Sequence, residues 1–383
     1  MKAPPEIPDQ VPARPAPRLL HFEVMTVLYG GGVLPGQSDP SLPFRGTSIR
    51  GHLRFWWRAT RGGAYDDLAD LRKRESEIWG STAQASGVKL RVLNWHAGTA
   101  KPAAEKRVEN GKAKWRLYEP SYVLFPAQED HAHIGQVYEG GRFDLELRYD
   151  PKIEADVEAA LWGWVNFGGI GARTRRGAGA LFCKEYLDSL GKAPELGHAG
   201  LRRWPTLKGA QVFQGGTEEQ WRVCWQTCIA VLRDFRQNRT RTFGRSLWPE
   251  ADAIRALRKQ DLARHPPQPN PLAPHGTFPR AAFGLPIVFH FKGDVPANHI
   301  LGTPEGDGRM ASRIILKPLP VSQSTAVPIL LLLRGPGAPA ILELREADGS
   351  VDTVSRGTLE ILRQFIDGAR NHPKWKKGKV IPL

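Results

Sequence analysis

An arginine-rich segment, Phe44–Arg58, is the part of the sequence best suited to binding chemistry, and it reads FRGTSIRGHLRFWWR. Five arginines and no carboxylate lie between Pro40 and Tyr65. On a helical wheel, four of them fall within about 80° of one another: Arg50, Arg54, Arg58 and Arg61. Neighbouring like charges on a helix repel, and the segment contains no acid to offset them. We therefore expect this face to bind an external polyanion such as a phosphate backbone; the alternative is a solvated basic face.

A second segment, Phe167–Gly179, combines five glycines with three arginines in the order FGGIGARTRRGAG. Glycine lets a backbone approach a ligand closely, and arginine offers paired donors that fit a phosphate. The segment has neither the Gly-Lys-Ser/Thr of an ATP-binding loop nor the GxGxxG spacing of a dinucleotide site. A helix is predicted before it and a strand after it, which reverses the order found in mononucleotide-binding loops. We therefore expect no ATP, NAD or other cofactor; the alternative is an exposed flexible hairpin.

The whole chain is basic. Its 383 residues contain 54 Lys and Arg against 39 Asp and Glu, which gives a formal charge of +15 and a pI of about 9.9. This balance indicates a polyanionic partner, most often nucleic acid. No apolar stretch approaches the ~20 residues that span a bilayer, and the N-terminus lacks the apolar core of a signal peptide. Three cysteines without a CxxC pair support neither disulfides nor a zinc site, so we expect a cytoplasmic protein without membrane contact.

The residues predicted to contact the polyanion come from the two segments, which we expect to converge in a single groove after folding. They are Arg45, Arg50, Arg54, Trp57, Arg58, Gly169, Gly171, Arg173, Arg175 and Arg176. Trp57 borders the arginine stripe and is a candidate for stacking on a base. Core packing is the alternative for a tryptophan at helical spacing.

One histidine and one acidic loop are the candidates for catalysis and for metal binding. His52, on the basic segment, has the side chain for general acid or base catalysis in metal-independent RNA cleavage. The alternative is a packed or capping histidine, because its wheel position lies away from the arginines. Asp130, His131 and His133 carry donor atoms for a metal, but no further ligand accompanies them. We interpret them as a solvated loop and expect no metal site.

Hydrophobic spacing predicts the elements that position these residues. In the first half we expect helices at 49–60, 67–79 and 153–167, strands at 20–24, 88–95, 121–126, 142–149 and 179–186, and an exposed charged insertion at 97–116. In the second half we expect helices near 221–235 and 359–366, and strands at 210–213, 286–292, 312–317 and 327–334. The similar succession in both halves predicts an α+β fold of two duplicated units. A proline-rich arm, 1–17, precedes them, and a polar stretch at 188–200 separates them.

The two segments resemble signatures of the RAMP superfamily, the repeat-associated mysterious proteins of CRISPR systems. Within it, FRGTSIRGHLRFWWR followed by GGIGARTRRGAG is similar to the family of first-numbered RAMP subunits of the Cmr, or type III-B, effector complex. Two later stretches, 278–286 (FPRAAFGLP) and 308–319 (GRMASRIILKPL), resemble the same family, so the likeness spans both halves. One departure is His52, where a small residue is expected.

The resemblance implies two tandem ferredoxin-like, RRM-related domains with long loop insertions, at 18–190 and 201–383, with the glycine-rich segment before the last strand of the first. It implies an RNA-binding subunit at the head of the complex, near the 3′ end of the guide RNA, acting in antiviral defence. Its implied partners are the guide RNA, the target RNA, other RAMP subunits, and the small and backbone subunits. In this family, target cleavage and cyclic-oligonucleotide synthesis belong to other subunits, so we expect no enzymatic activity.

Two alternatives stay open. One is a metal-independent endoribonuclease that uses His52, and the other is an assembly scaffold whose basic faces meet acidic subunits without RNA contact. Specific RNA cleavage in the presence of a chelator would favour the first. Failure of the isolated chain to bind RNA at physiological salt would favour the second.

Overall fold

The computed structural model shows regular structure along most of the chain. It describes residues 15–33, 38–109, 112–118, 120–124, 135–198, 200, 202–216, 218–237, 246–266, 272–346, 348–375 and 378–383. The predicted arm lies almost wholly outside these residues, and Asp130, His131 and His133 lie outside them entirely. Within the described ranges, no helix combines the length and the apolar composition that crossing a membrane requires.

The described residues form seven α-helices and eighteen strands. The helices are α1 (Gly46–Thr60), α2 (Leu68–Trp79), α3 (Ser121–Leu124), α4 (Glu154–Phe167), α5 (Trp221–Arg236), α6 (Glu250–Arg258) and α7 (Glu360–Asn371). The strands of the first half are β1 (Arg18–Val24), β2 (Leu28–Tyr29), β3 (Lys89–His96), β4 (Thr99–Pro102), β5 (Ala104–Glu109), β6 (Lys112–Leu117), β7 (Gln136–Glu139), β8 (Arg142–Arg148) and β9 (Leu181–Phe182). Those of the second half are β10 (Gln211–Gln214), β11 (Glu219–Gln220), β12 (Ile287–Phe289), β13 (His299–Gly302), β14 (Ile314–Pro320), β15 (Thr325–Leu332), β16 (Ile341–Glu346), β17 (Val351–Ser355) and β18 (Lys379–Pro382).

The first half builds a four-stranded antiparallel sheet in the order β3-β8-β1-β9. Strand β1 forms because apolar residues alternate along it, and Leu20, Phe22 and Val24 are buried. Its register pairs Phe22 with Phe143 of β8, and the two rings stack with centroids 5.0 Å apart. Residues of α1 and α4 share the core of this sheet. The chain order of these elements is strand, helix, strand, strand, helix, strand.

The second half has a five-stranded sheet in which β14-β15-β10-β18 follow the corresponding order, and the short β11 also pairs with β15. Helices α5 and α7 contribute to the core on this sheet, and the chain order of strands and helices matches that of the first half. In both halves the first and third of these four strands lie side by side at the centre of the sheet. The predicted α+β class, with several antiparallel sheets, is therefore confirmed.

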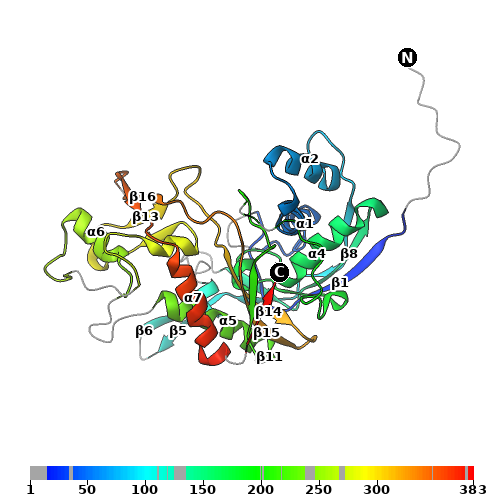
Figure 1. The fold of residues 1–383 in the computed structure, drawn as a ribbon. Helices are drawn as coiled ribbons and strands as arrows, with labels where there is room; N and C mark the ends of the chain where they lie inside the picture. The colour runs from blue at the N-terminus through cyan, green and yellow to red at the C-terminus, as the bar shows by residue number, and fades with distance from the viewer. Residues whose placement is uncertain are drawn as a thin grey trace, which may run out of the picture.

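Smaller sheets complete the molecule. One has the order β12-β13-β16-β17, another has the order β2-β7-β4, and β5 pairs with β6. In Figure 1, α1, α4 and β1 lie on the right, and α6 with β13 and β16 lies at the opposite end. Helices α5 and α7 lie between these two ends.

Several short elements differ from the prediction. The apolar run 121–126, predicted as a strand, contains the short helix α3, because a few apolar residues before a proline fit one helical turn as well as a strand. The insertion at 97–116 contains β4, β5 and β6. The strand predicted at 179–186 is reduced to β9, because a 3-10 turn follows at Lys184–Tyr186. The prediction also omits α6 and strands β13, β16, β17 and β18.

The two halves meet at a seam, formed by the end of α4, the glycine-rich segment and β14. Apolar residues from both sides, such as Phe167 and Ile315, belong to one core. Lys317 of β14 is fully buried there, and its Nζ donates to the carbonyls of Val165 and Gly168, at 2.9 Å each. Burial lowers the pKa of Lys317 to about 7. A single ammonium group therefore ties the second half to the end of α4.

Stability should depend on pH through Lys317. The ordinary pKa of a lysine is 10.5, so between about pH 7 and that value the unfolded chain holds a proton that the folded chain has lost. The unfolded state then binds more protons than the folded state, so the free energy of unfolding rises with pH in this window. Below about pH 7 the contribution of Lys317 does not change with pH. Lys317→Met should lose that rise. Urea unfolding of both proteins at several pH values measures it, and parallel pH profiles would contradict the prediction.

Candidate functional site

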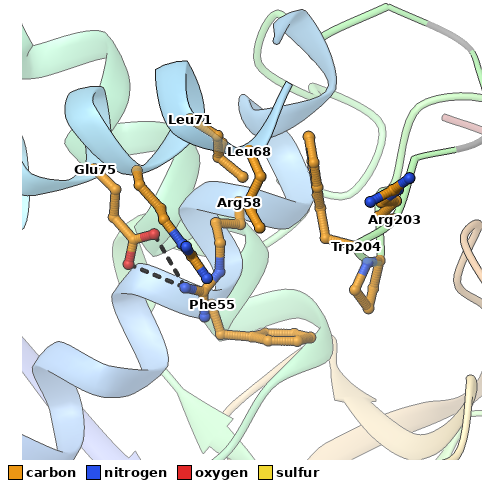
Figure 2. A pocket seen from close by; sticks show the side chains of 9 residues that line it. Phe55, Arg58, Leu68, Leu71, Glu75, Arg203 and Trp204 are labelled. Carbon is orange, nitrogen blue, oxygen red and sulfur yellow. Dashed lines mark hydrogen bonds and ion pairs between the residues drawn. The ribbon is translucent and has the colours of Figure 1, made fainter. Parts of the chain in front are cut away.

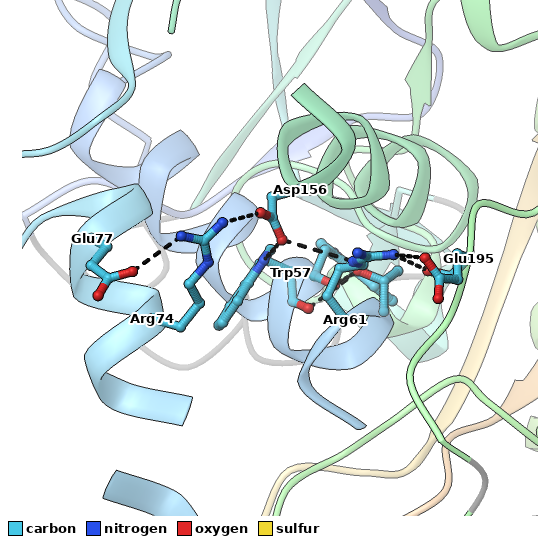
Figure 3. A network of polar contacts seen from close by, with 8 residues as sticks. Trp57, Arg61, Arg74, Glu77, Asp156 and Glu195 are labelled. Carbon is cyan, nitrogen blue, oxygen red and sulfur yellow. Dashed lines mark hydrogen bonds and ion pairs between the residues drawn. The ribbon is translucent and has the colours of Figure 1, made fainter. Parts of the chain in front are cut away.

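Helix α1 carries the arginine-rich segment and is anchored by its apolar face. Leu53 and Trp57 are fully buried, and the helix packs along α4. The indole N–H of Trp57 donates to Asp156 Oδ1 at 2.8 Å, and Arg74 of α2 binds the other oxygen of Asp156 at 2.8 Å (Figure 3). Trp57 is thus a core residue with no ring face open to a base. Its predicted stacking role is wrong, and the core-packing alternative holds.

The arginine stripe meets a carboxylate that its own segment does not contain. Glu75 of α2 is buried, and its Oε1 accepts from Arg54 Nε at 2.6 Å. Both oxygens of Glu75 also accept from Arg58 Nη1, at 3.0 Å each (Figure 2). The expectation of an uncompensated stripe is therefore wrong, because a neighbouring helix supplies the acid. One carboxylate between two arginines nevertheless leaves one positive charge in excess.

The other arginines of the segment also have protein partners. Arg50 donates to the backbone carbonyl at the end of α2, at 3.2 Å, and to the one just before β3, at 3.1 Å. Burial, together with the nearby Arg54, lowers the pKa of Arg50. Arg45 lies 3.2 Å from Asp39, and Arg61 lies 2.9 Å from an oxygen of Glu195 (Figure 3). The first turn of α1 and its last turn are thus tied to surrounding segments.

His52 packs against an aromatic ring. Its imidazole stacks on the indole of Trp164 of α4, with centroids 6.2 Å apart and planes 13° apart. Burial lowers the pKa of His52 to about 4, so the imidazole is neutral at pH 7. A base with so low a pKa removes protons poorly at neutral pH. This arrangement matches a packed histidine better than a general base.

Metal binding finds no support among the described residues. No group of three or more His, Cys, Asp or Glu side chains in these ranges is placed to hold a metal ion. Cys183, Cys224 and Cys228 are free and buried.

The glycine-rich segment follows α4 and leads into β9, as the resemblance implies. Gly171 has a φ of +83°, and a Cβ there would lie only 2.7 Å from the carbonyl oxygen of Tyr29. A Cβ on Gly169 would lie 2.7 Å from the carbonyl oxygen of Gly179. The close approach that we predicted for a ligand is therefore taken by the protein's own backbone.

Two of the three arginines in this segment point into the second half of the chain. Arg175 donates to the carbonyl of Ser312. Arg176 donates to the carbonyls of Ile314, at 2.7 Å, and Phe283, at 3.3 Å. Burial, with other arginines nearby, lowers the pKa of Arg176 to about 9. These guanidinium groups join the two halves across the seam, so the predicted phosphate contacts do not hold for them.

The two predicted segments do meet, but through one contact. The guanidinium carbon of Arg175 lies 5.4 Å from the ring centroid of Phe55 on α1, within the range of a cation–π interaction. The arginines of both segments do not converge in the expected groove, because Arg54 and Arg58 bind Glu75 while Arg175 and Arg176 bind carbonyls across the seam. Arg173 is the exposed arginine of the glycine-rich segment, with a φ of +60°.

A cavity of about 280 Å³ lies beside Phe55 (Figure 2). Its walls come from α1, from α2 and from the connection between the halves. The polar and aromatic residues that line it are Phe55, Arg58, Arg72, Glu75, Arg203 and Trp204. The sequence analysis missed Arg72, Arg203 and Trp204 because they lie outside both motifs. The run Arg-Arg-Trp at 202–204, in a polar connection, is the signal that points to them.

Comparison with known proteins agrees with the resemblance. Residues 21–182 match the model of the RAMP superfamily. This part of the chain is therefore similar to the RAMP superfamily. Two proteins with similar sequences come from Pyrococcus furiosus. The CRISPR system Cmr subunit Cmr1-2 is 29% identical over 178 residues, which cover 43% of this chain and 92% of that relative. The subunit Cmr1-1 is 29% identical over 160 residues, which cover 39% of this chain and 45% of that relative, less than half of its length.

Two solved structures are similar to this chain to different degrees. A chain in the cryo-electron microscopy structure of the type III-B Cmr-beta complex bound to cognate target RNA is 11% identical, with a TM-score of 0.50, over 93% of this chain and 99% of that chain. The crystal structure of Cmr1 from Pyrococcus furiosus, in its apo form, is 19% identical, with a TM-score of 0.47, over 85% of this chain and 90% of that chain. The first of these likenesses supports the fold described above.

Truncation of two arginines of the glycine-rich segment should change the free energy of unfolding by different amounts. Arg176→Ala removes the donor to the carbonyl of Phe283 and one of the two side-chain donors to the carbonyl of Ile314, so the free energy of unfolding should fall by roughly 1–3 kcal/mol. Arg173→Ala removes an exposed side chain, and the free energy should change by less than about 0.5 kcal/mol. Urea unfolding monitored by tryptophan fluorescence measures both. Equal losses in the two variants would contradict the structural role of Arg176.

Proposed function

We propose that this protein is a Cmr1-like subunit of a type III-B CRISPR effector complex, which binds RNA and acts in antiviral defence. In this role it helps to hold the guide RNA and to capture the target RNA, at the head of the complex near the 3′ end of the guide. Its two halves act as tandem ferredoxin-like domains. Its neighbours are other RAMP subunits and the small and backbone subunits.

The observation that carries this proposal is a surplus of positive charge around the cavity. Arg72 and Arg203 line it, are exposed, and pair with no carboxylate among the described residues. Arg58 shares the single carboxylate of Glu75 with Arg54. Arg173 adds a further exposed arginine, two residues from the one that covers Phe55. Unpaired arginines at a surface are the groups that bind phosphates and release counterions.

These arginines do not need to recognise the base sequence of the RNA. In RNA-guided systems, base pairing between guide and target reads the sequence, and the protein holds the backbone. The arginines around the cavity suit that task because a guanidinium binds any phosphate equally well. We also propose that the protein has no catalytic role in RNA cleavage, since the stacked, neutral His52 is poorly suited to general base catalysis.

RNA affinity should depend on salt through Arg58, Arg72 and Arg203 at the cavity and through the exposed Arg173 of the glycine-rich segment. If Arg58, Arg72, Arg173 and Arg203 each neutralise one phosphate of single-stranded RNA, the logarithm of affinity should fall against the logarithm of salt with a slope of about −3. The double variant Arg72→Ala, Arg203→Ala should reduce that slope by about 1.4. Fluorescence anisotropy with a labelled single-stranded RNA, at several salt concentrations, measures both slopes.

The matched control is the double variant Arg264→Ala, Arg370→Ala, which also removes two exposed arginines but outside the cavity. Its slope should stay close to that of the unaltered protein. Equal slopes for all three proteins would refute RNA binding at the cavity. No binding by the unaltered chain at physiological salt would favour the scaffold alternative.

RNA integrity tests the absence of catalysis. A labelled single-stranded RNA incubated with the purified protein and a chelator should remain intact over hours. His52→Ala should give the same result. Defined fragments that the unaltered protein produces and His52→Ala does not would restore the endoribonuclease alternative. Denaturing gel electrophoresis reads out both samples.

A further inference from the structure

The cavity beside Phe55 has an aromatic wall on each of two sides. Phe55 comes from α1, and Trp204 comes from the connection between the halves (Figure 2). Leu68 and Leu71 of α2 add apolar surface between them. The volume of about 280 Å³ lies near the lower end of small-molecule sites, which run from roughly 300 to 1,000 Å³. A volume of this size is sufficient for one planar ring system and too small for a duplex.

Both aromatic walls are held in place. The ring of Phe55 packs edge-on against Trp56, with centroids 5.1 Å apart, and the guanidinium of Arg175 covers it at 5.4 Å. Trp204 is 8% exposed and packs against Gly62, where an added Cβ would lie 3.2 Å from its Nε1. Side chains fixed in this way bind a ring with little loss of conformational entropy.

Exposed arginines also line the cavity, beside its aromatic residues. Arg72 and Arg203 are exposed cations without a carboxylate partner among the described residues. Arg58 reaches the cavity from α1, held by the buried Glu75 (Figure 2). An apolar aromatic slot beside several guanidinium groups suits a ligand with a planar ring and phosphates attached to it. An acidic peptide would use the arginines and leave the aromatic slot without a partner.

We propose that this cavity takes one unstacked base of a single-stranded RNA, held against Phe55 and Trp204, with the adjoining phosphates on Arg72 and Arg203. The inference rests on the proposed RNA-binding function and adds to it a contribution to RNA affinity that comes from the base. Stacking of a base on an aromatic side chain is worth roughly 1–3 kcal/mol, which corresponds to about 5- to 150-fold in affinity. The cavity discriminates little between the four bases, because each has a π-face.

Two RNA probes separate the base from the backbone. One is a single-stranded decaribonucleotide, and the other has the same length and charge but abasic riboses throughout. The unaltered protein should bind the first at least about 5-fold more tightly than the second at one salt concentration. Phe55→Leu and Trp204→Leu should each reduce that ratio toward one while leaving the salt slope unchanged. Phe55→Tyr and Trp204→Phe keep an aromatic ring and should retain most of the ratio.

A cross-linking measurement covers the case in which Trp204→Leu or Phe55→Leu fails to fold. RNA substituted with 5-iodouridine cross-links to aromatic rings under ultraviolet light. Peptide mapping of the unaltered protein should then find the label on the peptide that contains Phe55 or the one that contains Trp204. Labels only on other peptides would overturn the base site.

The outcomes distinguish the two proposals. RNA binding with the expected salt slope, but with a base-dependent ratio that the leucine variants do not change, would overturn the base site and leave the proposed function intact. Absence of any RNA binding would overturn both. Leucine variants that bind both probes normally but fail to join a reconstituted complex would identify the cavity as a protein-docking site, and would overturn the inference.

Discussion

Amino and guanidinium groups that donate to backbone carbonyls hold the two halves of this molecule together. Lys317 reaches from β14 to the end of α4, and Arg176 reaches from the glycine-rich segment back to the start of β14. Neither has an ion pair with a carboxylate among the described residues. A carbonyl accepts a hydrogen bond without carrying a full charge, so only well-aligned bonds offset the desolvation of each cation. The seam therefore fixes the relative position of α4 and β14 closely.

The basic residues of the chain fall into two groups with different tasks. Arg50, Arg54 and Arg176 have a structural role, because they donate hydrogen bonds to backbone carbonyls or to the buried carboxylate of α2. Arg72 and Arg203 are exposed and unpaired among the described residues, so their charge is available to a ligand. A formal charge of +15 is compatible with either division. Side-chain packing decides which arginines bond within the protein. The two motifs that stand out in the sequence contain mostly arginines with this structural role.

Much of the fold could be predicted from the sequence, because the long elements have strong hydrophobic periodicity. Strand β8 and helices α1 and α4 lie within a few residues of their predicted bounds. The site was harder to predict because its chemistry depends on contacts between distant segments. Nothing in the arginine-rich segment shows that Glu75 lies beside it, since that contact follows from how α2 packs on α1. Likewise, the spacing of the glycine-rich segment cannot reveal that its arginines face β14.

Arg175 links the two halves of the chain beside the cavity. Its guanidinium binds the carbonyl of Ser312 in the second half and covers the ring of Phe55 in the first. Trp204, on the opposite wall of the cavity, belongs to the connection between the halves. A rigid-body rotation of one half against the other would thus change the width of this cavity.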